Sequence, residues 1–577
     1  MDNPSEIPTP MPSENATYSV SETSLGTTRH VRIVTIGAGA SGINMIRTLR
    51  EHLTDYEHVV YEKNPSIGGT WYENRYPGCT CDIPAHNYQF SWRHNPSWST
   101  FFAGAPEIEK YLCTVCEEEK MGPSIKTSHQ VKKAVWDEEK AVWELEVQNL
   151  ETGERFGDYG HFLLDATGIL NNWKWPEIDG LHDFKGNLIH SANWPKEFEY
   201  AGKRVAVIGN GSSGVQIVPA LQKDVKELIH CIRSPTWIVP PQQETLLTSN
   251  CSELFGRVEM DGNKFTPAQI EKFNSEPAYY LQFVKAIEEE INSKFSVMLS
   301  QHMKSRLGGD ERLSKALIPA FPVGCRRLTP AVGYLEALTQ NNVRVVTDSI
   351  IRVVPTGIEI STGEVIEVDA IVCATGFDVS FCPRFPIVGK DSKNLQDLWK
   401  ENLPRAYMSN SVPGFPNYFS KFTQSVMTFE VADTLEVFLG PNAPIGHGSV
   451  FTITEHVAKY IANIIRKCQT ENIKAIAPSE AALNDFYEHL ETFMPRTAWS
   501  GTCRSWFKEG RESGPVTAVH PGSRIHWFHM LEQFRGEDFE YAYEKRNRFA
   551  YLGNGFSTKE LGDGDKSWYL GAVKARI

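Results

Sequence analysis

Several features typical of membrane, nucleic-acid-binding and secreted proteins are absent from this sequence of 577 residues. No run approaches the roughly 18 apolar residues of a membrane-spanning helix, so membrane insertion is not expected. Acidic residues outnumber basic residues by 71 to 58, giving a net charge of −13. Nucleic acids and anionic membranes attract basic surfaces, so neither is expected as the main partner. Residues 1–29 lack the apolar core of a secretory signal and are rich in Ser, Thr and Pro, which predicts a disordered leader.

The sequence also lacks a regular cysteine framework and the paired spacing of a zinc site. Eleven Cys residues are scattered along the chain, and Cys113 and Cys116 form the one CxxC motif. A redox pair or a zinc site is one interpretation of this motif. Packing in the helix-like run 107–120 is the favoured one, because no second CxxC completes a metal site. We therefore expect no metal and a reduced, intracellular chain in the cytoplasm.

The order of β-rich and helix-like segments predicts the fold class. A β-rich run at 31–36 breaks into glycines and is followed by a helix-like stretch and a second β-rich run at 58–61. The same succession returns from residue 204 to residue 232. Two β-α-β units in a chain of this length predict an α/β protein with two Rossmann-like dinucleotide-binding domains.

The first unit contains the GxGxxG motif Gly37, Gly39 and Gly42 between its strand and its helix. These glycines allow a tight turn, close approach of the backbone to a pyrophosphate, and close packing of helix on strand. The phosphates then meet the positive end of the helix dipole. Glu62 follows at the end of the second strand, where a carboxylate can bind both ribose hydroxyls. This unit therefore predicts an FAD site.

The second unit repeats the motif, but Arg233 and Ser234 stand where the first unit has its acid. A guanidinium pairs with a 2′-phosphate that a carboxylate would repel, which favours NADPH. A solvated surface charge is the alternative for Arg233. Pro219 falls in the helix after the glycines and is expected to cost a hydrogen bond or to kink it. The residues expected to hold NADPH here are Gly209, Gly211, Ser212, Ser213, Gly214, Arg233 and Ser234.

A helical insertion is expected to interrupt the second domain at about 242–319. Apolar residues there recur with the period of a helix, as expected for core packing: Tyr280, Val284, Ile287, Ile291, Phe295 and Met298. The expected organisation is a leader (1–29), a first part of the FAD domain (30–175), the NADP domain (176–385), a second part of the FAD domain (386–545) and a C-terminal tail (546–577).

Two dinucleotide sites imply electron transfer between two nucleotides, and disulfide reductases share this layout. Those enzymes need a cysteine pair against the flavin. Neither the pair Cys79 and Cys81 nor the CxxC motif lies on the helix after Gly42, which disfavours this alternative.

Two motifs bring in a family resemblance. Phe184-x-Gly186-x-x-x-His190-x-x-x-Trp194-Pro195 directly precedes the second glycine loop and resembles the fingerprint of Baeyer–Villiger monooxygenases. In that family the motif is thought to link domains; a loop in which His190 and Trp194 simply pack is the alternative. The longer family signature resembles Gly69-x-Trp71-x-x-x-x-Tyr76-Pro77-Gly78-x-x-x-Asp82. Further matching segments, which extend the resemblance over about 31–540, are Gly324-Cys325-Arg326-Arg327, Ala374-Thr375-Gly376-Phe377-Asp378, Cys503-Arg504-Ser505-Trp506-Phe507 and Pro521-Gly522.

The resemblance implies that NADPH reduces FAD and that the reduced flavin takes up O₂ as a peroxide. The peroxide must stay deprotonated to attack a ketone, so a fixed cation is required. Arg327 is the candidate, with Asp82 pairing with it and holding its orientation; a structural ion pair is the alternative. Arg326 stands where the family usually has Lys, which keeps the charge but changes its geometry. The residues that the resemblance places at the cofactors are Gly69, Thr70, Trp71, Asp82, Tyr88, Arg326, Arg327 and Trp506, the last near the nicotinamide ribose.

The leading hypothesis for the reaction is insertion of one oxygen atom next to a ketone carbonyl, giving an ester or a lactone. Oxidation of nitrogen or sulfur by the same cofactors is an alternative, and a non-catalytic NADPH sensor is another. The loop 440–448, which contains His447, is expected to line the substrate pocket or to be a surface turn. The insertion and the acidic leader resemble those of fungal family members in secondary metabolism, which suggests a bulky polyketide or terpenoid ketone.

Overall fold

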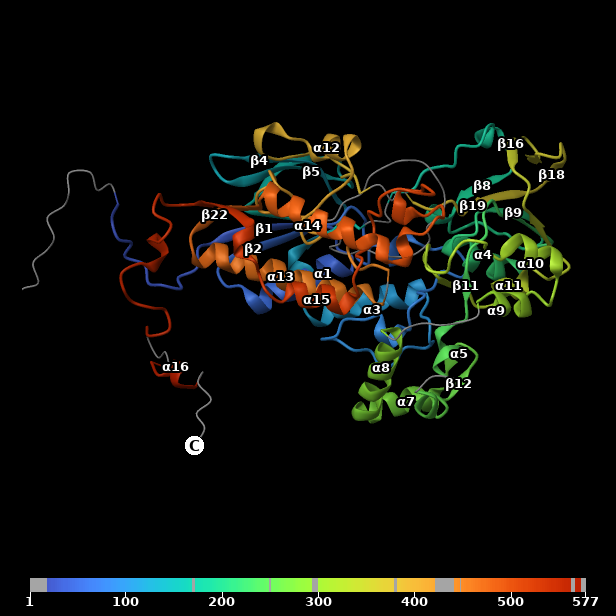
Figure 1. The fold of residues 1–577 in the computed structure, drawn as a ribbon, viewed down its shortest axis with the longest axis horizontal. Coiled ribbons are helices and arrows are strands. Elements are labelled where there is room, and N and C mark those ends of the chain that lie inside the picture. Colours follow the sequence, from blue (N-terminus) through green and yellow to red (C-terminus); the bar gives the residue numbers. More distant parts are fainter. Residues whose placement is uncertain are drawn as a thin grey trace, which may run out of the picture.

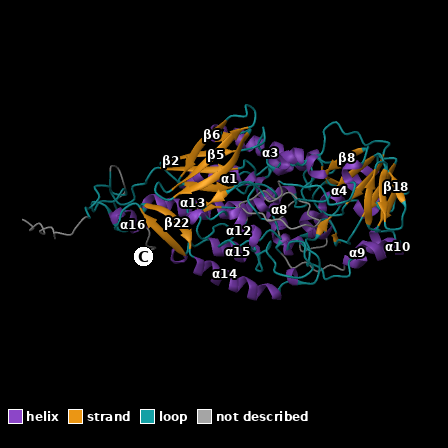
Figure 2. Cartoon of the chain, turned by 90° about the horizontal axis from the view of Figure 1, so that it is seen from above, coloured by secondary structure: helices purple, strands orange, loops and turns teal. Residues whose placement is uncertain are grey.

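The computed structural model describes residues 18–168, 172–247, 251–292, 299–377, 381–420, 440–446, 448–561 and 566–571. Two five-stranded parallel sheets, one for each predicted nucleotide site, lie side by side along the long axis of the molecule (Figure 1). Figure 2 shows most of the strands gathered in two separate groups. This arrangement confirms the α/β fold with two Rossmann-like units. Among the described helices, none has the length and apolar character needed to cross a membrane.

The first sheet is built on a buried central strand, β1, whose apolar residues have almost no exposed surface. Helix α1 (Ala40–His52) connects β1 to β2 and packs against α13 (Val450–Thr470), a long helix from the C-terminal part of the chain. The C-terminal part therefore returns to the first domain. The strands in spatial order are β21 (Tyr418–Phe419), β7 (Phe162–Asp165), β1 (Val31–Ile36), β2 (Tyr56–Tyr61) and β3 (Ile125–Lys126).

A second layer packs against this sheet, with contacts between β1 and β6 and between β5 and β7. It is a four-stranded sheet in which β4–β5 and β5–β6 pair antiparallel, while β20 joins β4 in parallel. Its strands are β20 (Ile387–Val388), β4 (His129–Asp137), β5 (Val142–Asn149) and β6 (Arg155–Gly160).

The second parallel sheet repeats the plan, with α4 (Ser212–Gln222) connecting β9 to β10. Pro219 lies in the last turn of α4, and the helix continues through it to Gln222, so the lost hydrogen bond does not end the helix. The strands in spatial order are β15 (Val343–Val346), β10 (Glu227–Cys231), β9 (Arg204–Ile208), β19 (Ala370–Cys373) and β8 (Asn187–His190). Further elements of this domain are α11 (Tyr334–Ala337) and the antiparallel strands β16 (Ile350–Val354), β17 (Gly357–Ile360) and β18 (Val365–Glu367).

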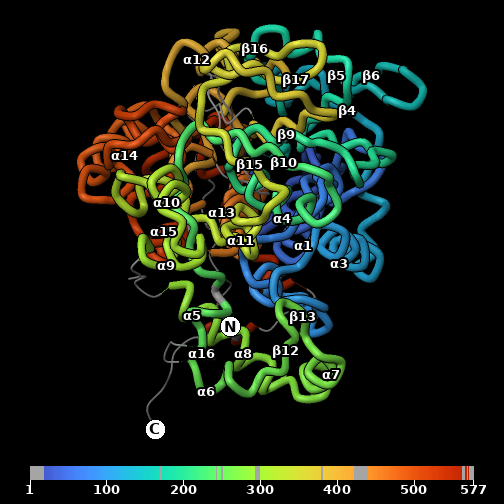
Figure 3. The backbone as a smooth tube through the Cα atoms, turned by 90° about the vertical axis from the view of Figure 1, so that its right-hand side faces the viewer, coloured from blue at the N-terminus to red at the C-terminus, as the bar shows by residue number. Residues whose placement is uncertain are grey.

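The segment predicted as an insertion is helical, and α6 and α7 project from the body (Figure 3). Its aromatic core includes Phe101 and Phe102 of the first domain, so half of the insertion packs on the first domain. Tyr280 and Ile287 of the predicted stripe are buried there; Phe295 and Met298 lie outside the described residues. The elements are β11 (Ile238–Val239), α5 (Gln242–Leu246), α6 (Ser252–Phe255), β12 (Met260–Asp261), β13 (Lys264–Phe265), α7 (Pro267–Ser275), α8 (Pro277–Ile291), α9 (Leu299–Arg306), α10 (Glu311–Leu317) and β14 (Thr329–Pro330).

The part of the predicted leader that is described differs from the expectation of disorder. Ser24 forms a β-bridge with Gly553, and Leu25 forms one with Ser557. Pairing between the two ends of a chain leaves no local sequence pattern, which is why composition alone suggested disorder. The remaining elements are α2 (Thr70–Glu73), α3 (Ala105–Glu118), α12 (Leu395–Glu401), β22 (Ile473–Pro478), α14 (Glu480–Phe493), α15 (Arg524–Leu531), β23 (Phe539–Tyr543) and α16 (Trp568–Gly571).

Candidate active site

The turn from β1 into the first residues of α1 has no room for side chains at two glycines. A Cβ atom on Gly42 would lie 2.0 Å from the carbonyl oxygen of Gly37, and one on Gly37 would lie 2.5 Å from that of Ala166. Gly37 also has a φ of +103°. Gly39 precedes α1 without any side-chain cap. The glycine turn and the first N–H groups of α1 together have the geometry of a site that can bind a pyrophosphate.

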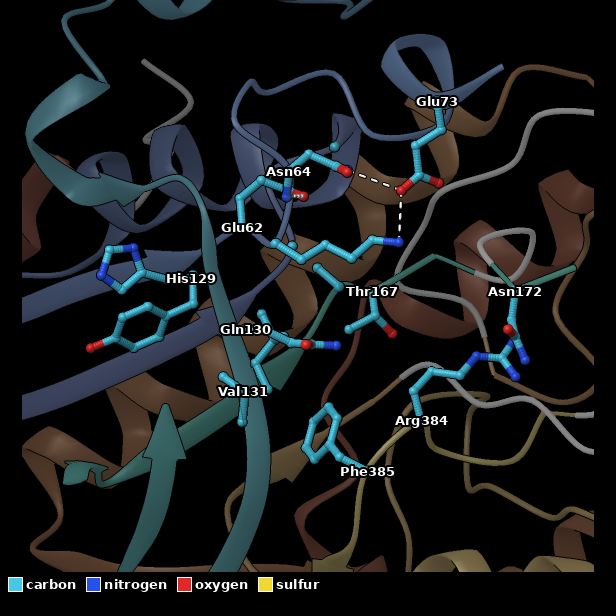
Figure 4. A pocket seen from close by; sticks show the side chains of 16 residues that line it. Glu62, Asn64, Glu73, His129, Gln130, Val131, Thr167, Asn172, Arg384 and Phe385 are labelled. Atoms are coloured by element: carbon cyan, nitrogen blue, oxygen red, sulfur yellow. Dashed lines mark hydrogen bonds and ion pairs between the residues drawn. The ribbon is translucent and has the colours of Figure 1, made fainter. Parts of the chain in front are cut away.

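Glu62 lies beside this loop, on the wall of a cavity of about 350 Å³ (Figure 4). Its side chain accepts hydrogen bonds from the backbone N–H groups of Ala38 and Asn64, both at 2.8 Å. Only 4% of the residue is exposed, and this burial raises the pKa of the carboxyl. Arg384 lines the same cavity. The sequence did not point to it, because the motif Ala374–Asp378 stops before it. Asp378 itself lies outside the described residues.

The second glycine loop has the same geometry as the first. A Cβ on Gly214 would lie 2.1 Å from the carbonyl oxygen of Gly209, and Gly211 precedes α4. Ser212 and Ser213 form the buried first turn of that helix. The structure therefore has a second loop with the geometry that can bind a pyrophosphate.

Arg233 lies at the end of β10 with its side chain exposed, and it lines a cavity of about 330 Å³ together with Gly209. The carbonyl oxygen of Ser234 accepts a hydrogen bond from Asn210 Nδ2 at 3.0 Å. Arg326 reaches the same strand end, because its Nη1 donates to the carbonyl oxygen of Pro235 at 3.3 Å. Two guanidinium groups thus lie near the place where a 2′-phosphate is expected.

Arg327 and Asp82 form an ion pair between the two domains. Nη2 of Arg327 donates to Oδ2 of Asp82 at 2.6 Å, and the two side chains are 16% and 7% exposed. Charged groups this well covered interact more strongly than a surface pair, because little water screens them. The pairing that the sequence suggested is therefore present, and it is not a solvent-exposed contact.

The signature segment before Asp82 packs beside the first glycine loop. Gly69 has a φ of +54° and precedes α2, and the N–H of Gly68 donates to the carbonyl oxygen of Ala38. Trp71 is buried with its ring edge-on to that of Tyr88, 5.5 Å away. Thr70 Oγ1 accepts a hydrogen bond from Asn74 Nδ2 at 2.8 Å. The hydrogen bond from Gly68 to Ala38 fixes the segment against the first glycine loop.

His190 of the fingerprint motif joins the segment between the domains to the second domain. Its ring stacks on Trp173 with centroids 4.6 Å apart, and its Nε2 lies 3.3 Å from Oγ1 of Thr375. Burial lowers the pKa of His190 to about 4, so the ring is neutral near neutral pH. Trp194 packs against Phe198. The motif thus makes structural contacts, as the packing interpretation expects.

The expectation of a fully reduced chain is wrong for one pair of cysteines. Cys325 and Cys503 form a disulfide across 178 residues of sequence, with Cα atoms 6.3 Å apart. It joins the segment of Arg327 to the segment of Trp506, whose half-buried ring lies 4.6 Å from that of Phe507. Both cysteines lie within motifs of the family resemblance, but which cysteines form a disulfide cannot be deduced from the sequence.

The CxxC motif has a simpler role. Cys113 and Cys116 lie on α3 as free thiols, and burial raises the pKa of Cys116 to about 12. A thiol that keeps its proton is a poor nucleophile and a poor metal ligand. Within the described part of the chain, no cluster of side chains suits a metal ion.

The loop 440–448 is not a surface turn in its described part. Residues 440–445 are buried, and Asn442 Nδ2 donates to the carbonyl oxygens of Val516 and Val519. His447 lies outside the described residues.

Comparison with known proteins agrees with this geometry. Residues 35–105 match a model of the NAD(P)-binding Rossmann-like domain, and residues 131–250 match one of the flavin-binding monooxygenase-like family. The chain is 38% identical over 563 residues to the FAD-binding monooxygenase tazF of Aspergillus terreus, covering 94% of this chain and 95% of that protein. It is 32% identical over 507 residues to a Baeyer–Villiger monooxygenase of Streptomyces coelicolor, covering 86% and 89%. The closed crystal structure of cyclohexanone monooxygenase superposes with a TM-score of 0.72 at 25% identity, covering 90% of this chain and 100% of that one.

The two glycine loops, the cavity at Glu62 and the cavity at Arg233 have the positions that the sequence predicts for two nucleotide sites. The two relatives cover 94% and 86% of this chain. The chain therefore belongs to the class B flavin monooxygenases of the Baeyer–Villiger type, and it is an NADPH-dependent enzyme that uses FAD and O₂.

Proposed function

We propose that this enzyme inserts one oxygen atom from O₂ next to the carbonyl of a bulky ketone, and that Arg327 is the cation that serves the transfer. FAD and NADPH, when bound, supply the hydride and the activation of oxygen. The observation that carries the proposal is the ion pair of Arg327 with Asp82. Arginine keeps its proton at every working pH, so its positive charge is permanent. A permanent cation stabilises negative charge that develops on oxygen.

Asp82 has a positioning role in this proposal. A guanidinium so little exposed would be costly without a nearby carboxylate. The short hydrogen bond between Nη2 and Oδ2 also fixes the plane of the guanidinium, so its charge is directed before substrate arrives. Because each partner belongs to a different domain, the site is complete only in this relative arrangement of the domains.

The remaining named residues would bind the cofactors. Glu62 would accept hydrogen bonds from the FAD ribose, and its backbone partners already orient its carboxylate. Arg233 and Arg326 would pair with the 2′-phosphate of NADPH, which NADH lacks. Trp506 would stand near the nicotinamide ribose. Its segment is tied to that of Arg327 by the disulfide, which supports a shared site.

A bulky ketone from secondary metabolism is the proposed substrate class. Curated relatives at 35% to 38% identity, among them proteins of Aspergillus terreus, Emericella nidulans and Dothistroma septosporum, are fungal. The insertion also reaches the region of the loop 440–448, since Glu288 of α8 pairs with Arg524. The Arg524 side chain fills the space where Gly448 would carry a Cβ. This contact supports a role of the insertion in shaping the substrate pocket.

The test compares ketones of increasing size with a thioether and an amine, using the wild type, Arg327→Ala and the control Arg352→Ala. Arg352 lies on β16 and pairs with Glu359 at the surface of the second domain. We expect esters or lactones from the wild type and the control, with the larger ketones preferred. Arg327→Ala should oxidise NADPH and release hydrogen peroxide without ester. Ester formation by Arg327→Ala at the wild-type rate would refute the role of Arg327.

The two alternatives predict different products. An N- or S-oxidising enzyme would convert the thioether or the amine and leave every ketone unchanged. A sensor would bind NADPH and form no oxygenated product.

A further inference from the structure

The side chain of Gln216 crosses from the second domain to the first. It lies on α4, and its Oε1 accepts a hydrogen bond from the hydroxyl of Tyr76 at 2.9 Å. Its Nε2 donates to the carbonyl oxygen of Thr80 at 2.9 Å. One primary amide therefore holds both ends of the segment Tyr76–Thr80. This segment belongs to the family signature, which does not itself indicate what the segment contacts.

The same segment lies directly against the backbone of α4. A Cβ on Gly78 would lie 2.5 Å from the carbonyl oxygen of Gln216 and 3.1 Å from Cβ of Ala220. Gly78 also has a φ of +81°, a conformation that favours glycine. The segment and the helix therefore fit together through both shape and hydrogen bonds.

This contact stands between the two halves of the proposed site. Ser212 and Ser213, at the start of α4, are expected at the NADPH pyrophosphate, about 6 Å along the helix axis from Gln216. On the other side, Thr80 is separated from Asp82 only by Cys81, which is buried and donates its N–H to the carbonyl oxygen of Ala103. A shift of α4 would therefore reach Asp82 through a short, packed stretch of backbone.

We propose that Gln216 is a positioning residue that couples NADP(H) binding at α4 to the placement of Asp82 and Arg327. It acts through the segment Tyr76–Asp82 and does not touch the reacting atoms. When the nucleotide fixes the start of α4, the amide of Gln216 fixes the segment, and Asp82 then holds the guanidinium. The inference rests on the proposed role of Arg327.

The chemistry of the amide explains why the residue is Gln. The position needs an acceptor for the Tyr76 hydroxyl and a donor for the Thr80 carbonyl at the same time. Glu would lose the donor and set a negative charge against a carbonyl oxygen. Met has a similar shape but offers neither strong bond. Gln216→Met thus removes both bonds with little change in volume.

Gln222 provides a matched control on the same helix. Its Nε2 donates to Oδ1 of Asn342 at 2.9 Å, a contact within the second domain. Gln222→Met removes an amide hydrogen bond from α4 without touching the first domain. An effect of Gln216→Met that Gln222→Met lacks would therefore come from the contact between domains.

The first readout is hydrogen exchange of the holoenzyme in peptides covering residues 76–86, with and without NADP⁺. We expect NADP⁺ to slow exchange in this segment in the wild type and in Gln222→Met, and to leave it unchanged in Gln216→Met. By linkage, the Kd for NADP⁺ should rise about three- to tenfold in Gln216→Met alone. Equal NADP⁺-dependent protection in Gln216→Met and the wild type would overturn the proposal.

The second readout separates positioning from folding. Gln216→Met should accept hydride from NADPH at nearly the wild-type rate but yield more hydrogen peroxide per ester. If Gln216→Met does not retain FAD, Tyr76→Phe, which loses only the hydroxyl donor, is judged by the same exchange criterion. A wild type that forms no ester would refute the proposed function, whereas the exchange experiment would still decide the role of Gln216.

Discussion

Asp82 and Arg327 are 245 residues apart in the sequence and belong to different domains, yet their side-chain atoms meet at 2.6 Å. Each lies at the end of a short motif that also contacts the other domain or a nucleotide cradle. Asp82 lies two residues after Thr80, which Gln216 holds, and Arg327 lies two residues after Cys325, which is bonded to Cys503. The position of the guanidinium therefore depends on contacts among three separate stretches of the chain.

Asp82→Asn tests the carboxylate without changing its shape. Removing one partner of a well-covered ion pair lowers the free energy of unfolding by about 3 to 5 kcal/mol, because the other charge is left uncompensated. We expect about tenfold less ester per NADPH consumed, with the difference recovered as hydrogen peroxide. The control is Glu359→Gln, which breaks the ion pair with Arg352 on the antiparallel strands of the second domain. A loss of coupling of equal size in both variants would contradict the positioning role of Asp82.

Arg233→Ala tests the assignment of the second nucleotide. A charge-assisted hydrogen bond is worth about 1.5 to 3 kcal/mol, so the KM for NADPH should rise about ten- to a hundredfold. The KM for NADH should not change, because NADH has no 2′-phosphate for the guanidinium to bind. Initial rates of NADPH and NADH oxidation measure this, with Arg352→Ala as the surface control. An equal rise of the KM for NADPH and for NADH would contradict binding of the 2′-phosphate by Arg233.

The sequence predicted those parts of the site whose chemistry is local. Gly37, Gly42 and Glu62 follow from backbone geometry and a fixed spacing within one β-α-β unit. Arg327 and Asp82 follow from the family resemblance, and the structure brings them together. The clamp by Gln216 and the bond between Cys325 and Cys503 could not be predicted. Both depend on side chains meeting across domains, and such meetings leave no periodic pattern in either segment.

The packing of the leader and of the insertion could not be predicted from the sequence for the same reason. The described part of the leader pairs with the C-terminal tail, and half of the insertion packs on the first domain. Composition could identify polar and helical segments but could not assign the surface against which each one packs.

The disulfide makes a simple prediction about thiol counts. The chain has eleven Cys residues, and nine of them are free. Alkylation of the denatured, unreduced protein should therefore add nine labels, and alkylation after reduction should add eleven. Peptide mapping should find Cys325 joined to Cys503. Eleven labels without reductant, in protein prepared without added thiol, would contradict the bond.

The buried His190 makes stability depend on pH in a defined range. Its pKa is about 4 in the folded protein, against an ordinary value of 6.5. The unfolded chain therefore takes up a proton first, and stability falls as pH drops from 6.5 towards 4. The loss from this one group approaches about 3 kcal/mol below pH 4. His190→Gln should flatten the decline of Tm over this range. An identical pH profile for His190→Gln and the wild type would contradict this origin.

The most direct test of the central claim follows the oxygen atom. The holoenzyme would be incubated with NADPH, a bulky cyclic ketone and oxygen-18 gas, and the product identified by mass spectrometry. A Baeyer–Villiger reaction predicts a lactone that carries one labelled oxygen atom in the ring, with about one NADPH consumed per lactone. Unchanged ketone, with all the NADPH oxidation accounted for by hydrogen peroxide, or a label found only in an oxidised thioether or amine, would contradict the account.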